Sequence, residues 1–186
     1  RLYMAGPTSD ITSYVRETPT GATGPGQGRY FWTFVAKIPA DAKGSYQFGI
    51  EGYRTTTVLE GTKKQRSIRD YGANAIYSAS LGNEPSAPRR TVVSTANCNK
   101  CHYVLEFHGG NRNDAQMCTF CHNPNLTEGA QATSWNYATM IHRYHGEEVR
   151  YPGILQNCSQ CHTGNSQSLP LKEGLQPVKK IGRAHV

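Results

Sequence analysis

No stretch of this 186-residue chain approaches 18 consecutive apolar residues, so the sequence predicts no membrane-spanning helix. Cysteine and histidine are both absent from residues 1–90. Thiol and imidazole chemistry must therefore come from the other half of the chain. An initiator Met and the basic-then-apolar leader of a signal peptide are also missing, because the chain begins at Arg1. We expect either that a signal peptide was removed or, as we favour, that the sequence is a piece of a longer protein.

The second half contains six cysteines, and all of them occur in pairs of one spacing. Two residues separate the thiols of each pair, and a histidine follows the second cysteine directly. This arrangement attaches a c-type haem, because the two thiols add to its vinyl groups and the histidine ligates its iron. The sequence therefore predicts three covalently bound haem c groups, held by Cys98, Cys101 and His102, by Cys118, Cys121 and His122, and by Cys158, Cys161 and His162.

Paired cysteines also occur as disulfides in exported proteins and as zinc ligands. Neither use requires a histidine directly after the second cysteine. Because 7 of the 186 residues are histidine, finding one at all three such places by chance has odds of about one in 20,000. An odd number of cysteine pairs also suits tetrahedral zinc poorly. Haem attachment is the favoured interpretation, with zinc and disulfides as its alternatives.

Four histidines remain once the three proximal iron ligands are assigned. A lone histidine is most often an ordinary surface or core residue. Here, however, the first of the four is followed by Gly109 and Gly110, which let backbone approach a flat cofactor without a Cβ in the way. We hypothesise that three of them are distal ligands, which makes every haem bis-histidine, and that the last is a spare candidate. These residues are His108, His142 and His145, with His185 as the spare.

His142 and His145 fall in a segment that reads as a short helix, with Thr133 or Ser134 as its N-cap and Gly146 closing it. Residues three apart leave a helix on the same side, so each imidazole could reach the iron of a different haem. His108 is not expected to serve the first haem, because six residues give little chain to cross a porphyrin. Met117 and Met140 are alternative sulfur ligands, although filling gaps beside a haem is the commoner use of methionine.

Acidic residues are fewer than basic ones, 13 against 20, and the formal net charge is +7. Such an excess usually indicates nucleic acid or a membrane surface as a partner. The basic residues are scattered, however, apart from short runs at 63–66 and 179–180. Three ferric haems would add about −3 and three ferrous haems about −6 through their propionates, which leaves roughly +4 or +1. We therefore expect no nucleic-acid partner.

The two halves of the chain predict different structures. Residues 91–186 must wrap three haems with about 95 residues, so we expect a loop-rich, mainly α domain whose core is the porphyrins. Residues 1–90 predict an antiparallel β-sandwich or split barrel. Only about five strands are visible, fewer than a sandwich commonly has, which suggests that this domain is N-terminally incomplete. The strand candidates are 30–38, 45–50, 2–4, 58–59, 74–77 and 90–93; the glycine-rich stretch 20–28 is interpreted as a plain loop.

The order of motifs from 98 to about 171 resembles that of the OmcA/MtrC-type multihaem cytochromes of bacterial cell surfaces. The matching pieces are Cys98-x-x-Cys-His with His108-Gly109-Gly110, Cys118-x-x-Cys-His-Asn123-Pro124, Met140-Ile141-His142-x-x-His145, Tyr151-Pro152-Gly153, Asn157-Cys158-x-x-Cys-His and Leu169-Pro170-Leu171. Residues 4–10 and 39–44 also look like the β domain that precedes the haems in that family. Members typically carry ten haems in two domains, whereas this chain has three motifs, so it is either a fragment or a short member.

The resemblance implies a role in extracellular electron transfer, with the haems forming a wire rather than an active site. It implies metal oxides, flavins, other multihaem cytochromes or copies of the same chain as partners. Because thioether bonds form outside the cytoplasm, we expect an exported protein at the cell surface or in the periplasm. A rival hypothesis is a multihaem reductase of a small anion or metal, which needs one open iron position; the spare histidines argue against it. A passive scaffold with merely structural haems is the third.

Overall fold

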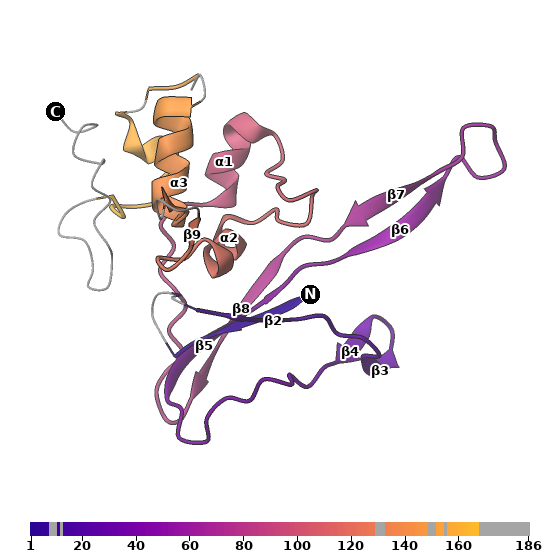
Figure 1. Ribbon diagram of the computed structural model, residues 1–186, viewed down its shortest axis with the longest axis horizontal. Coiled ribbons are helices and arrows are strands. Elements are labelled where there is room, and N and C mark those ends of the chain that lie inside the picture. Colours follow the sequence, from indigo (N-terminus) through magenta and orange to yellow (C-terminus); the bar gives the residue numbers. More distant parts are fainter. Residues whose placement is uncertain (8–10, 12, 129–132, 149–151, 155, 168–186) are drawn as a thin grey trace.

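The computed structural model describes residues 1–7, 11, 13–128, 133–148, 152–154 and 156–167. Among these residues, eight strands occupy the first half of the chain, and short helices with one small two-stranded sheet form the second (Figure 1). The strands are β1 (Leu2–Ala5), β2 (Val15–Glu17), β3 (Thr23–Gly26), β4 (Arg29–Phe31), β5 (Gly44–Ile50), β6 (Tyr53–Val58), β7 (Arg66–Tyr71), β8 (Ala75–Leu81), β9 (Thr127–Glu128) and β10 (Thr133–Ser134). The helices are α1 (Thr95–His102), α2 (Ala115–Cys121) and α3 (Tyr137–Arg143), with a π-helical turn η1 (Tyr144–Glu148) and a 3-10 turn η2 (Cys158–Gln160). Within these residues no helix is long and apolar enough to cross a membrane.

Four strands form an antiparallel sheet in the order β2-β1-β5-β8. Its register sets Tyr3 of β1 opposite Gly49 of β5, and Gly49 opposite Ile76 of β8. These residues share one face, because directly opposed residues of neighbouring strands point to the same side. The antiparallel β organisation predicted for the first half is thereby confirmed, and it is consistent with a β-sandwich-like domain.

Helix α2 of the second half packs on that face of the sheet and completes one hydrophobic core. Tyr3 and Phe120 are fully buried, and Met117 is 2% exposed. A Cβ added to Gly49 would lie 2.8 Å from Met117 Sδ, so the bare backbone of this glycine gives the helix its close approach. The apolar alternation of residues 45–50 marks the opposite face, where Ile50 remains 49% exposed.

Most of the strand predicted at residues 30–38 does not form, since the observed strand β4 ends at Phe31. Only Arg29–Phe31 pairs, with β3, so the glycine-rich stretch predicted as a plain loop forms half of a small hairpin. The Glu17 carboxylate explains where the strand ends: it accepts hydrogen bonds from the Trp32 indole at 2.9 Å and from the backbone N–H groups of Val35 and Ala36 at 3.1 and 2.9 Å. Because these N–H groups donate to the Glu17 side chain, they do not pair with a neighbouring strand. The same hydrogen bonds lower the pKa of Glu17.

Strands β6 and β7 form a long hairpin that projects away from the rest of the chain (Figure 1). The pairing runs from Tyr53 opposite Tyr71 to Val58 opposite Arg66. The prediction reached only residues 58–59 of this hairpin, because its sequence lacks the alternation of a half-buried strand. Residues 90–93 are not a strand either, apart from one bridge between Val93 and His162.

Candidate functional site

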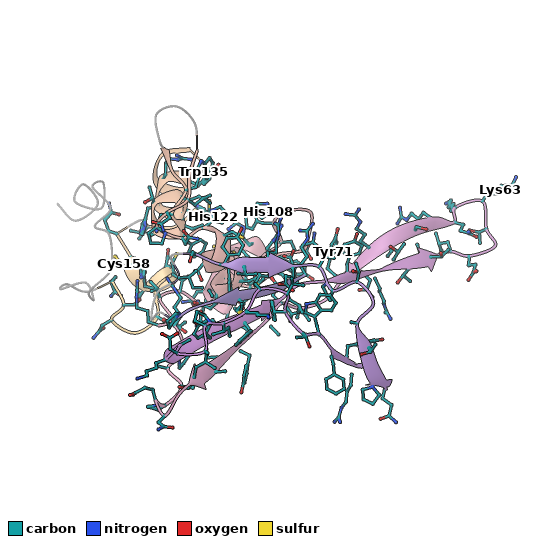
Figure 2. The ribbon with its side chains drawn as sticks, turned by 60° about the horizontal axis from the view of Figure 1, so that its bottom comes forward. Lys63, Tyr71, His108, His122, Trp135 and Cys158 are labelled. Atoms are coloured by element: carbon teal, nitrogen blue, oxygen red, sulfur yellow. The ribbon has the colours of Figure 1, made fainter. Side chains whose placement is uncertain are left out.

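Six histidines of the second half lie in three pairs, and each pair joins a motif histidine to one of the spare histidines. The ring centroids are 6.1 Å apart for His102 and His145, 6.1 Å for His122 and His108, and 6.0 Å for His162 and His142. We call these pairs, with the cysteines of their motifs, site 1, site 2 and site 3. Figure 2 shows the two histidines of site 2 beside each other, far from Lys63 at the tip of the projecting hairpin.

The separations fit two imidazoles that ligate one iron from opposite sides. Each metal–nitrogen bond is about 2 Å and each ring centroid lies about 1.15 Å behind its nitrogen, which places the centroids about 6.3 Å apart. A direct hydrogen bond between the rings would bring the nitrogens to about 2.9 Å and the centroids to about 5.2 Å. The ring planes meet at 84°, 28° and 29°, and coordination leaves that angle free because both planes contain the iron–nitrogen axis. The residues therefore fit a bis-histidine haem at each site.

The Nδ1 atoms of four of these rings have identifiable partners. His122 and His145 face the carbonyl oxygens of Trp135 and Ile141 at 2.9 and 2.8 Å. His142 faces the carbonyl oxygen of Ala138 at 2.7 Å, and His162 faces the Ser166 hydroxyl at 3.1 Å. A carbonyl oxygen only accepts, so Nδ1 of the first three rings carries the proton and Nε2 keeps its lone pair for a metal. Such hydrogen bonds fix the ring orientation and raise ligand basicity.

Local sequence explains how the motifs are presented. Helix α1, which carries Cys98 and Cys101, begins after Ser94, whose hydroxyl accepts from the Asn97 backbone N–H at 3.1 Å. Helix α2 begins after Asp114, whose carboxylate accepts from the N–H groups of Gln116 and Met117 at 2.7 and 3.3 Å. Side-chain oxygens are the preferred N-caps of helices. Each helix then ends at or just before its proximal histidine.

Helix α1 contacts the N-cap of α2 and the third motif. Its Thr95 hydroxyl donates to the Asp114 carboxylate at 2.9 Å, and Asn97 Nδ2 donates to the Cys161 carbonyl at 3.1 Å. The segment before α1 also pairs with the chain directly after the third motif, because the Thr163 N–H donates to the Val92 carbonyl at 2.9 Å. Site 1 is therefore in direct contact with the elements of sites 2 and 3.

Helix α3 and η1 place His142 and His145 toward different partners, as the spacing of the two residues indicated. The predicted cap was wrong. Asn136 caps the helix, with its side chain accepting from the Ala138 N–H at 3.0 Å, while Ser134 belongs to strand β10. Gly146 does not close the helix, because the backbone continues through it as the π-helical turn. Such turns occur frequently at functional sites.

None of the six cysteines is paired in a disulfide in the structure. Burial raises the pKa of Cys118 to about 12, and burial together with nearby Cys161 raises the pKa of Cys98. Among the residues that the structure describes, no three His, Cys, Asp or Glu side chains gather as a group that could hold a bare metal ion. A haem iron needs only two ligands from the chain, and each histidine pair could supply them.

Two further candidates are placed differently. Met117 is buried in the core beneath the sheet, together with Tyr3 and Phe120. His185 lies outside the described residues. Sequence reasoning missed the Trp135 carbonyl as a partner of His122, because every residue supplies a backbone carbonyl and no residue type marks this one.

Two comparisons with known proteins found matches. Residues 90–185 match the family model described as outer membrane cytochrome MtrC/MtrF-like, domains II/IV. A curated relative, the periplasmic nitrate reductase electron transfer subunit of Wolinella succinogenes, is 28% identical over 129 residues, which cover 64% of this chain and 61% of that protein. The chain thus spans about three fifths of the length of that relative.

Proposed function

Since this chain belongs to the MtrC/MtrF-like outer membrane cytochromes, and is therefore an electron-transfer cytochrome that binds haem c, we propose that it carries electrons through three bis-histidine haems. The observation that carries the proposal is the set of three histidine pairs at 6.0–6.1 Å, each joining a motif histidine to a distant one. Haem iron supplies reversible one-electron chemistry when it is bound in such a site.

The chain's own residues have three tasks in this function. The six motif cysteines hold the haems covalently, and His102, His122 and His162 are the proximal ligands. His145, His108 and His142 are their distal partners, in that order. The backbone carbonyls beneath Nδ1 orient the rings, which favours a fixed, six-coordinate site over one that exchanges ligands. Because every site has two imidazoles, no position stays open for a substrate, and this favours electron transfer over reduction of a bound anion.

We assign residues 1–90 to a β-sandwich-like domain and residues 91–186 to a trihaem domain. Site 1 contacts the elements of both other sites through α1, so we place it between them. We further propose that the protein is exported and acts at the cell surface or in the periplasm. The family description names the outer membrane and the relative's name the periplasm. Other multihaem cytochromes, copies of this chain, flavins and metal oxides are its proposed partners; metal reduction would occur at an exposed haem edge.

The first test is the intact mass of the full chain purified with its haems attached, which should show three additions, together with the absorption spectrum, which should be low-spin throughout. His108→Ala, His142→Ala and His145→Ala should each turn about one haem in three high-spin. His185→Ala tests the spare candidate and should leave the spectrum unchanged. A haem-free chain contradicts the proposal, as do distal variants that stay fully low-spin. Uptake of carbon monoxide by the reduced wild-type protein would instead favour the reductase.

A further inference from the structure

His108 differs from the other two distal histidines in the backbone that carries it. His142 and His145 stand on consecutive helical turns, each with Nδ1 against the carbonyl four residues earlier. His108 stands on a turn from Phe107 to Arg112, whose ends exchange backbone hydrogen bonds of 2.9 and 3.2 Å. Its backbone φ of 54° lies in the left-handed region, which residues other than glycine rarely adopt. This conformation persists only if the surroundings hold it.

The contacts that stabilise this conformation come from residues 1–90, which we call the β-rich half of the chain. Asn74, in the link between β7 and β8, and Asn113, directly after the turn, form a reciprocal pair. The N–H of each donates to the side-chain oxygen of the other at 2.8 Å. Asn74 Nδ2 also donates to the Asn111 carbonyl at 2.8 Å, and Asn113 Nδ2 donates to the Gly72 carbonyl at 2.9 Å. We call these four hydrogen bonds the asparagine clamp.

Two further contacts fix the same turn. The Tyr71 ring lies directly against Gly110, where an added Cβ would be 2.6 Å from Tyr71 Cε2. Arg112, at the end of the turn, pairs with Glu51 at 2.7 Å and donates to the Tyr3 hydroxyl at 3.0 Å. The Glu51 side chain is 2% exposed. In each of these contacts the partner lies within residues 1–74, so the turn that carries His108 is attached to the β-rich half at three points.

We propose that Asn74 and Asn113 are positioning residues for the distal ligand of site 2, so that the β-rich half determines whether this haem is six-coordinate. The inference rests on the proposed function, because His108 matters as a ligand only if site 2 holds a haem. The asparagines donate to each other, to the Asn111 carbonyl and to the Gly72 carbonyl, so they act through the backbone of the turn. Loss of the clamp releases His108 while Cys118, Cys121 and His122 keep the haem attached.

The test compares Asn113→Ala with Asn83→Ala, an exposed asparagine in the turn after β8, in the full chain with haems attached. Asn113→Ala should keep the wild-type haem count by mass, while about one haem in three becomes high-spin and binds carbon monoxide when reduced. Asn83→Ala should match the wild type. Asn113→Asp retains the oxygen that accepts from the Asn74 N–H, so it should restore most of the low-spin spectrum.

Site specificity is tested by adding Asn113→Ala to His108→Ala, where it should raise the high-spin fraction no further. Gly110→Ala, which pushes against Tyr71, is a second route to the same spectrum if Asn113→Ala folds poorly. The proposal is overturned if Asn113→Ala lowers the melting temperature but stays low-spin, or if high-spin signal appears equally with His108 already removed. These outcomes leave the proposed function standing, whereas a wild-type chain without three low-spin haems removes that function itself.

Discussion

Phe120→Ala tests whether the β-rich half and the haem-bearing half unfold as one unit. Phe120 occupies the second position between Cys118 and Cys121, yet it is fully buried, with its ring 5.7 Å from that of Tyr3. Haem attachment requires only the cysteines and the histidine of the motif, so the variant should keep its haem. Truncation removes most of a buried ring and leaves a cavity between α2 and the sheet, which costs about 3–5 kcal/mol. For a chain of this size we expect a melting temperature lower by about 6–20 °C.

The matched control is Lys100→Ala, which changes the equivalent position of the first motif, where the side chain is exposed. We expect its effect to stay within about 0.5 kcal/mol of the wild type. The assay follows the far-ultraviolet signal of the sheet and the visible spectrum of the haems during the same melt. Both should shift together in Phe120→Ala. The shared core is refuted if Phe120→Ala melts like Lys100→Ala, or if the haem signal shifts while the sheet signal does not.

Three further predictions concern the same framework. Gly49→Ala places a Cβ 2.8 Å from Met117 Sδ and should destabilise the protein by about 1–3 kcal/mol in urea unfolding. Gly52→Ala is the control, because nothing lies within 4 Å of a Cβ at that position. Equal unfolding midpoints for the two variants would contradict the close packing of Met117 on Gly49. Asp114→Ala removes the N-cap of α2 and should lower the stability of the protein by about 1–2 kcal/mol. Asp114→Asn retains an acceptor oxygen and should lower the stability less. Equal losses of stability in the two variants would show that the cap is not responsible. Burial raises the pKa of Tyr3, so the folded chain keeps this proton more tightly than the unfolded chain does. The corresponding stability is complete below about pH 10 and falls as the pH rises past it, and Tyr3→Phe should reduce that fall between about pH 8 and pH 11 in urea titrations.

Much of the site could be predicted because its chemistry is local. Two thiols and an imidazole within five residues specify a haem wherever the chain runs, so the motifs need no fold to be recognised. A helix at His142 was also predicted, although it ends at Arg143 and His145 lies in the following π-helical turn. Its cap was misplaced because Asn136 and Ser134 are both good caps, and only the backbone shows which side chain reaches an N–H.

The β-rich half was harder to predict, because its strands depend on solvent exposure and on distant hydrogen-bond partners. The hairpin of β6 and β7 is exposed on both faces, so its sequence carries no alternation to detect. The stretch after Phe31 has strand-like residues, but its N–H groups bond the Glu17 carboxylate, which lies 15 to 19 positions away in the chain. Local propensity cannot reveal such a competitor.

The sequence by itself predicted the haem groups, the cysteines and proximal histidines that would hold them, and the histidines available as distal ligands. The tertiary structure decided which distal histidine faces which motif, because that choice depends on where α3 and the His108 turn lie in space. It also showed that the β-rich half provides both the core beneath α2 and the asparagine clamp. Those contacts join residues 37 or more positions apart, and only the folded chain brings them together.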